Sequence, residues 1–137
     1  MAVENPRRVG CIVGIYPVCD LRSYPGLKKA ADAYGMTEAE LAASLSEHNP
    51  IERIKPLAEA GVPILHIHGK LDKVVPLERN SAELARRYRQ LGGKMRVIVV
   101  PNRRHEMAPE FFRSQEFVDF LIEHAVATGS TTDETKR

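Results

Sequence analysis

Hydrophobic and polar positions follow one another in blocks along this chain of 137 residues. Mostly apolar runs occupy residues 9–16, 62–68 and 95–100, and proline, glycine or polar residues bound each of them. Short apolar runs of this kind are typical of strands that are buried on both faces of a parallel sheet. We therefore predict three β-strands over these ranges.

Helical signals occupy residues 37–46, 76–91 and 109–124. Thr37 and Glu40 have the spacing of a capping box, and the two later ranges carry apolar side chains at helical spacing. Strands and helices that alternate in this way indicate right-handed crossovers around a parallel sheet. The pattern predicts a three-layer α/β fold.

Composition and charge exclude several classes of protein. The chain is 43% hydrophobic and 28% charged, as in ordinary globular domains, and its net charge of +2 is too balanced for a nucleic-acid binder. No apolar run approaches the roughly 18 residues of a membrane span, and the first residues lack the apolar core of a signal peptide. We expect a cytoplasmic protein with neither nucleic acid nor membrane as a partner.

One carboxylate and one imidazole follow neighbouring predicted strands. Asp72 lies in the loop after residues 62–68, and His105 lies in the loop after residues 95–100. The carboxyl ends of parallel strands form the edge of a sheet at which function collects. An Asp that accepts a hydrogen bond from an imidazole can orient a general base. Alternatively, Asp72 is a turn former and His105 a surface residue.

The stretch from His66 to Asn80, with the pattern HxHGxxDxVVPxxxN, resembles the acid-bearing segment of α/β-hydrolases. It is most similar to esterase-like and prolyl-oligopeptidase-like serine hydrolases. The resemblance implies that Asp72 is the acid and His105 the base of a catalytic triad. It also implies hydrolysis of a carboxylic ester or related acyl bond, a small-molecule or carbohydrate-linked ester as substrate, and no cofactor.

The same resemblance suggests how the chain is organised. Residues 1–127 resemble the C-terminal part of an α/β-hydrolase, in which residues 21–60 form a cap-like or irregular insertion. We expect residues 128–137, which are polar, to be a disordered tail.

Two departures from the family pattern stand out. The family carries its nucleophile in G-x-S-x-G, and no serine of this sequence lies in that context. The six serines are Ser23, Ser44, Ser46, Ser81, Ser114 and Ser130. The family also has Gly-x-Gly before its histidine, where this chain has residues 102–104, Asn-Arg-Arg. We therefore expect either a displaced base loop or a less well-poised histidine. We also expect a chain that lacks its nucleophile segment and is inactive alone.

Other interpretations of the sequence remain open. Cys19 could act as a nucleophile if a nearby cation lowered the pKa of its thiol. His66 and His68 point to one face of a strand and could bind a metal with Asp72 or His105, although we predict no metal site. In the main alternative, the chain is a truncated or degenerate, non-catalytic α/β module that forms a homodimer or pairs with another chain through the edge of residues 9–16.

Overall fold

The computed structural model describes residues 2–129, and a three-stranded parallel sheet lies at its centre. The strands are β1 (Ile12–Ile15), β2 (Ile64–Gly69) and β3 (Met95–Val100), in the spatial order β1-β2-β3. Both pairs are parallel, so all three strands end at the same edge of the sheet. The three predicted strands are confirmed, with β1 shorter than its apolar run.

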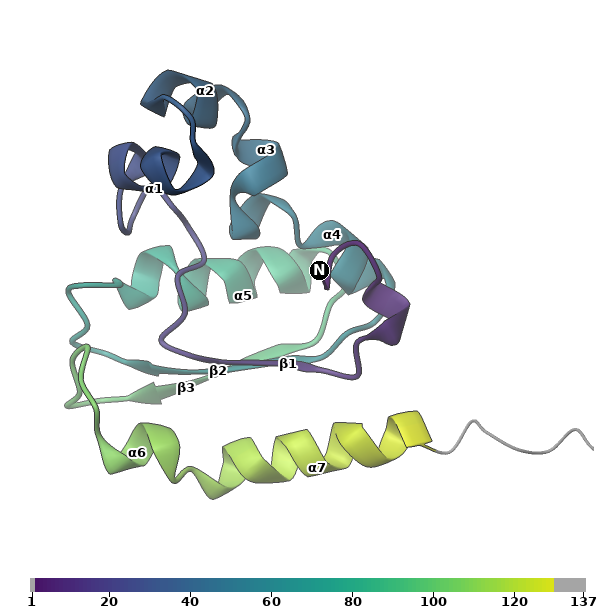
Figure 1. Cartoon of the computed structure of the whole chain (residues 1–137). Coiled ribbons are helices and arrows are strands. Elements are labelled where there is room, and N and C mark those ends of the chain that lie inside the picture. Colours follow the sequence, from purple (N-terminus) through teal and green to yellow (C-terminus); the bar gives the residue numbers. More distant parts are fainter. Residues whose placement is uncertain (1, 130–137) are drawn as a thin grey trace, which may run out of the picture.

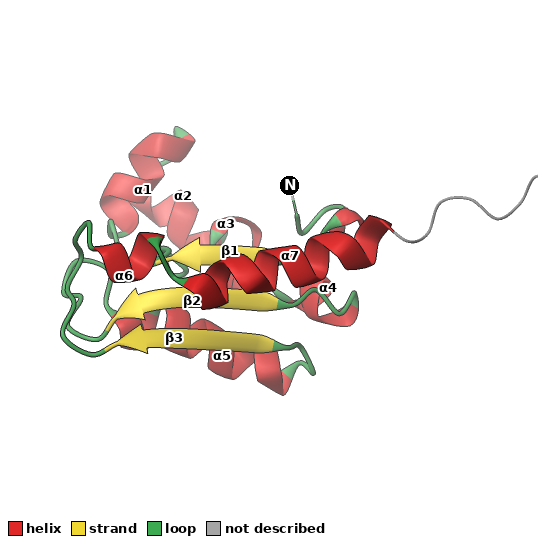
Figure 2. Ribbon diagram, turned by 90° about the horizontal axis from the view of Figure 1, so that it is seen from below, coloured by secondary structure: helices red, strands yellow, loops and turns green. Residues whose placement is uncertain are grey.

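Helices cover both faces of this sheet, as Figures 1 and 2 show. On one face lie α4 (Lys55–Glu59) and α5 (Ser81–Gln90), and on the other lie α6 (Pro109–Phe112) and α7 (Gln115–Gly129). The predicted three-layer α/β architecture is therefore confirmed. None of the helices within residues 2–129 is long and apolar enough to cross a membrane.

Two apolar clusters hold these layers together. Between the sheet and α4 and α5, the fully buried Tyr88 donates a hydrogen bond from its hydroxyl to the carbonyl oxygen of Val62, at 2.6 Å. Burial raises the pKa of this hydroxyl to about 12, so it stays protonated and keeps its role as donor. On the other face, Ile67 of β2 packs against Phe111 of α6.

The predicted insertion of residues 21–60 is mostly helical. It contains α1 (Leu27–Tyr34), α2 (Glu38–Ala43), α3 (Leu45–His48) and α4. In Figure 1, α1 and α2 stand apart from the sheet, and they share a small apolar cluster of their own. The capping box at the start of α2 is present, but the polar composition of α1 gave no signal of a helix.

Two predicted helices are interrupted. Residues 77–79 form a 3-10 turn, η3 (Leu77–Arg79). The helix α5 begins only at Ser81, because the dihedral angles of Asn80, φ −119° and ψ −97°, are not helical. Near the C-terminus, the chain breaks between α6 and α7, where the hydroxyl of Ser114 accepts a hydrogen bond from the backbone N–H of Phe117. Residues 128 and 129 belong to α7, and the rest of the predicted tail lies outside the described residues.

The prediction that residues 9–16 are buried on both faces is wrong for β1. Its four residues are only half-buried. The reason is its place at the edge of the sheet, where β2 pairs with it on one side.

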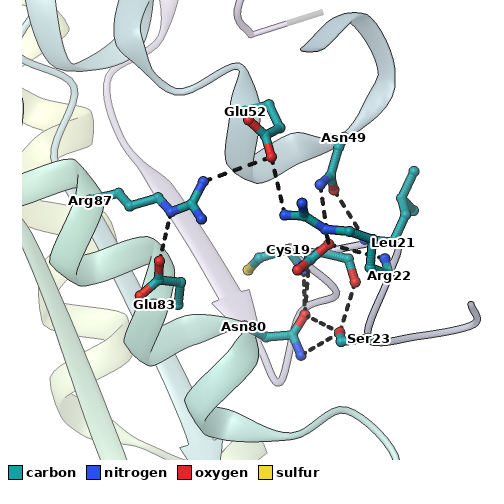
Figure 3. A network of polar contacts seen from close by, with 10 residues as sticks. Cys19, Leu21, Arg22, Ser23, Asn49, Glu52, Asn80, Glu83 and Arg87 are labelled. Atoms are coloured by element: carbon teal, nitrogen blue, oxygen red, sulfur yellow. Dashed lines mark hydrogen bonds and ion pairs between the residues drawn. The ribbon is translucent and has the colours of Figure 1, made fainter. Parts of the chain in front are cut away.

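Asn80 joins the segment after β1 to the start of α5 (Figure 3). Its side-chain oxygen accepts hydrogen bonds from the backbone N–H groups of Cys19, at 2.9 Å, and Asp20, at 3.1 Å. Its amide donates to the hydroxyl of Ser23 and to the carbonyl of Pro76, each at 2.9 Å. Asn80 is fully buried, so water cannot take its place as the hydrogen-bonding partner of these four groups.

We expect the substitution Asn80→Leu, which preserves side-chain size, to lower the free energy of unfolding by about 2–4 kcal/mol. The reason is that two buried backbone N–H groups lose their acceptor, at about 1–3 kcal/mol each. Urea unfolding monitored by circular dichroism measures the change. The same substitution at the exposed Asn102 is the control, with an expected change within about 0.5 kcal/mol. Equal effects at both positions would contradict the role of Asn80.

Candidate active site

The two residues predicted to form an acid–base pair meet at the carboxyl edge of the sheet. Asp72 lies just beyond β2, and His105 lies in the loop beyond β3. The ring nitrogen Nδ1 of His105 is 2.8 Å from the Oδ2 atom of Asp72. The structure therefore brings together two side chains that are 33 positions apart in the sequence.

The carboxylate of Asp72 is held in place by its own loop. Its side chain is fully buried, and its Oδ1 atom accepts hydrogen bonds from the backbone N–H groups of Val74, at 2.9 Å, and Val75, at 2.8 Å. A buried carboxylate needs such donors, because it has lost its hydration. With Oδ1 occupied in this way, Oδ2 is directed at His105.

The position of the proton on His105 follows from this contact. A carboxylate oxygen can only accept, so Nδ1 of a neutral His105 carries the hydrogen and donates it. The other ring nitrogen, Nε2, then has a free lone pair. The His105 side chain is 32% exposed, so a reacting group can approach it. Chemically, this arrangement can accept a proton at Nε2 while Asp72 stabilises the imidazolium that forms.

Tyr16 supports the imidazole from the end of β1. Its ring centroid lies 4.4 Å from that of His105, and Phe111 packs edge-on against it at 5.2 Å. Tyr16 has a φ of +35°, an arrangement that costs of order 1–3 kcal/mol in a non-glycine residue. Its N–H donates to the carbonyl of Ile67 at 2.8 Å, which holds the strained residue beside the site. No sequence pattern pointed to this role.

The loops that carry the acid and the base are in direct contact. The backbone N–H of Leu71 donates to the carbonyl oxygen of Arg103 at 2.9 Å. A Cβ atom on Gly69 would lie only 2.5 Å from that same oxygen, so the approach requires glycine. Of the non-glycine residues described, Tyr16 alone has a positive φ, so Arg104 needs no left-handed conformation. His105 reaches Asp72 from this loop, and a displacement of the loop relative to other members of the family stays a prediction.

The two arginines before His105 differ in their surroundings. Arg103 forms ion pairs with Glu110 and Glu106. Arg104 instead borders a small pocket of about 300 Å³ beside His105. The other residues that line this pocket are Leu71, Lys73 and Val74.

His66 and His68 share a hydrogen-bonding partner that the sequence analysis did not identify. The Nδ1 atoms of both rings contact the hydroxyl of Ser81, at 3.0 Å from His66 and 2.8 Å from His68. The Nε2 atom of His68 lies 2.8 Å from the carbonyl oxygen of Val75 and 3.5 Å from Oδ2 of Asp72. Burial is the main cause that lowers the pKa of both rings, to about 4 for His66.

This arrangement does not fit the metal site considered from the sequence. Both ring nitrogens of His68 are engaged within the protein, so neither is free to bind a metal. In the part of the chain that the structure describes, no group of three or more His, Cys, Asp or Glu side chains could hold a metal ion. His68 instead lies behind the loop of Asp72 and binds the carbonyl of Val75.

Cys19 and the serines are poor candidates for a nucleophile paired with His105. Burial raises the pKa of the Cys19 thiol to about 12, and the negative charge of Asp20 adds to the effect. Ser81 is fully buried between two other histidines, and Ser23 and Ser44 donate to backbone carbonyls. Within residues 2–129, no serine forms a hydrogen bond with His105.

The chain is similar to one protein family and to a solved esterase structure. No curated protein matches the chain. A solved structure, carboxyl esterase 2 (TmelEST2) from the mycorrhizal fungus Tuber melanosporum, is similar at 20% identity and a TM-score of 0.41. That match covers 93% of this chain but only 44% of the esterase, so the chain spans less than half of that protein's length. The model of the prolyl oligopeptidase family matches residues 1–127.

The family match covers nearly the whole sequence, including the stretch from His66 to Asn80 on which the resemblance to serine hydrolases depended. That resemblance is therefore confirmed: the chain belongs to the prolyl oligopeptidase family.

Proposed function

We propose that this chain supplies the acid and the base of a serine hydrolase that cleaves a carboxylic ester or a related acyl bond. The observation that carries the proposal is the 2.8 Å contact between Nδ1 of His105 and Oδ2 of Asp72. The buried carboxylate fixes the tautomer of the imidazole, and the His105 side chain is partly exposed, which supports a role for Nε2 as the base.

The proposed chemistry follows from these two side chains. Nε2 of His105 takes the proton of a serine hydroxyl as that oxygen attacks the acyl carbon, and then donates the proton to the leaving group. Asp72 keeps Nδ1 protonated throughout and stabilises the imidazolium. A water molecule, activated by the same Nε2 atom, then hydrolyses the acyl-enzyme.

The pocket beside His105 supports a small substrate. Its volume of about 300 Å³ is at the lower end of the range for ligand pockets. Leu71 and Val74 give it an apolar wall, while Lys73 and Arg104 add positive charge. We propose a small-molecule or carbohydrate-linked ester, with α1 and α2 acting as a cap over the edge of the sheet where the pocket lies.

We further propose that the nucleophile comes from outside these 137 residues, in a G-x-S-x-G turn. Support comes from the sequence, which has no such motif, and from the hydrogen bonds that occupy Ser23, Ser44 and Ser81. The edge of β1 is open to a further strand that could carry this turn.

We expect no stoichiometric labelling of this chain by a fluorophosphonate probe, because no serine in its described part is paired with His105. The same chain extended by the segment encoded directly upstream of Met1 should be labelled at a G-x-S-x-G serine. In the extended protein, Asp72→Asn should slow labelling by about four orders of magnitude, because an amide at this position favours the wrong tautomer of His105. Mass spectrometry of the intact protein measures the labelling.

Asp20→Asn is the matched control, since Asp20 is also a buried aspartate but pairs with Arg22 at 2.8 Å. It should leave the labelling rate within about twofold. Rapid labelling of the 137-residue chain, or equal rates for the two variants, would contradict the proposal. An upstream segment without G-x-S-x-G would favour the second function below.

The open edge of β1 favours a second candidate function, that of a non-catalytic module that pairs with another chain or with a second copy. The N–H of Ile12 donates to Pro63, just before β2, and that of Tyr16 donates to Ile67 in β2. By the alternation of a strand, the N–H groups of Val13 and Ile15 face away from β2. Unpaired N–H groups on an apolar edge are a template for another strand.

If this second function holds, the wild-type chain should sediment as a dimer and Val13→Pro as a monomer. Proline at this position removes an outward N–H without breaking a hydrogen bond to β2. Sedimentation velocity distinguishes the two states. Val99→Pro is the control at the opposite edge, where Val99 is 41% exposed, and it should leave the dimer intact. A monomeric wild type, or a dimer lost only in Val99→Pro, would contradict pairing through β1.

We also propose a cytoplasmic location. Both cysteines, Cys11 and Cys19, are free thiols. Free thiols are common in reducing compartments, where disulfides are rare.

A further inference from the structure

A second cavity, separate from the pocket beside His105, lies between the sheet and α4 and α5. Its volume is about 360 Å³. Its walls are mostly apolar and include Ile12, Ile54, Leu57, Ile64 and Leu84, which come from β1, β2, α5 and the α4 region. Glu47, His48 and Arg53 also line it, the first two from α3. The pocket beside His105 shares none of its lining residues with this cavity. Neither the acid nor the base of the proposed hydrolase lines it.

One polar side chain reaches this apolar cavity from the sheet. His66 lines it, although the residue is only 5% exposed. The imidazole edge with Cδ2 and Nε2 lies over Gly14 of β1, where a Cβ atom would be 3.0 Å and 3.2 Å from these two atoms. Glycine at this position therefore gives the ring its place beside the cavity.

The proton positions in the chain of hydrogen bonds behind His66 can be deduced step by step. The carbonyl oxygen of Val75 can only accept, so Nε2 of His68 carries a hydrogen. The Nδ1 atom of a neutral His68 must then accept the hydroxyl hydrogen of Ser81. That hydrogen is the only one the hydroxyl has, so the oxygen of Ser81 accepts from Nδ1–H of His66.

These hydrogen bonds determine the state of Nε2 of His66, the last nitrogen in the series. With its hydrogen on Nδ1, a neutral His66 has a bare lone pair on Nε2. Burial lowers the pKa of His66 to about 4, and the neighbouring His68 contributes, so the ring is neutral near pH 7. Within residues 2–129, the hydrogen bond of the His66 ring is the one that its Nδ1 atom forms with Ser81, and Nε2 has no donor from the protein.

We propose that this cavity binds a compact, neutral, apolar molecule with a hydroxyl group, of the class of phenols and short alcohols, whose O–H donates to Nε2 of His66. The apolar walls would bury the hydrocarbon part of such a molecule, and the lone pair requires a donor rather than an acceptor. The two charged residues of the lining, Glu47 and Arg53, have opposite signs, so they give the cavity no net charge that would favour an ion. The inference does not depend on the proposed hydrolase function.

Titration of the chain with phenol and with anisole tests the proposal, because the two molecules are similar in shape and only phenol donates a hydrogen bond. Nitrogen-15 correlation spectra report both the backbone around the cavity and the histidine rings. We expect saturable binding of phenol, up to about tenfold tighter than that of anisole. Nε2 of His66 should have the chemical shift of an unprotonated nitrogen, and this shift should move when phenol binds.

Two variants separate the hydrogen bond from the apolar contribution. His66→Phe removes the acceptor and Ser81→Ala removes the group that fixes the tautomer, so both should abolish the preference for phenol while anisole still binds. If His66→Phe does not fold, Ser81→Ala and the wild-type spectra still test the hydrogen bond from phenol to Nε2 of His66. A protonated Nε2 in the wild type, equal affinities for the two probes, perturbations away from the cavity, or a phenol preference that survives Ser81→Ala would overturn the proposal.

Discussion

The buried carboxylate of Asp72 is the constraint on which the carboxyl edge of the sheet depends. An unpaired charge in this position would cost several kcal/mol of folding free energy, so both of its oxygens need donors. Val74 and Val75 supply two backbone N–H groups and His105 supplies a third donor. The loop after β2 therefore has to turn tightly, and the loop after β3 has to reach back to it.

The same constraint explains why the two loops are in contact. Gly69 allows the carbonyl of Arg103 to approach the end of β2, and the N–H of Leu71 donates a hydrogen bond to this carbonyl oxygen. Behind the loop, Nε2 of His68 forms a hydrogen bond with the carbonyl of Val75, and its Nδ1 atom forms another with the hydroxyl of Ser81 at the start of α5. The acid is thus supported by the strand before it and the helix after it. Positioning at this level is what a base in acyl transfer requires.

The stretch from His66 to Asn80 contains most of what the sequence could predict about the site. The two strands that precede Asp72 and His105 have strong apolar runs, and parallel strands bring their ends to one edge, so the pairing of these residues followed from topology. The resemblance supplied their roles as a hypothesis. Asn80 was part of the quoted pattern, and the structure now supplies its physical role as the acceptor for Cys19 and Asp20.

Other features of the structure could not be predicted from the residues around them in the sequence. Ser81 has the sequence context of a helical serine, and only the fold places it between His66 and His68. Tyr16 meets His105 across 89 positions of sequence, a contact that no periodicity encodes. The helix α1 is polar on average, and its two buried alanines depend on contact with Leu41 of α2. Half-burial of β1 depends on which strands flank it, and an apolar run does not specify its neighbours.

The central claim is that Asp72 holds His105 in the tautomer of a general base. Nitrogen-15 correlation spectra of the histidine rings in the wild-type chain, recorded where His105 is neutral, test it most directly. The account predicts a hydrogen on Nδ1 of His105 and a bare lone pair on Nε2, with the Nδ1 signal assigned through Asp72→Asn. A hydrogen on Nε2 in the wild type, or an exchange-averaged mixture of both tautomers, would contradict it.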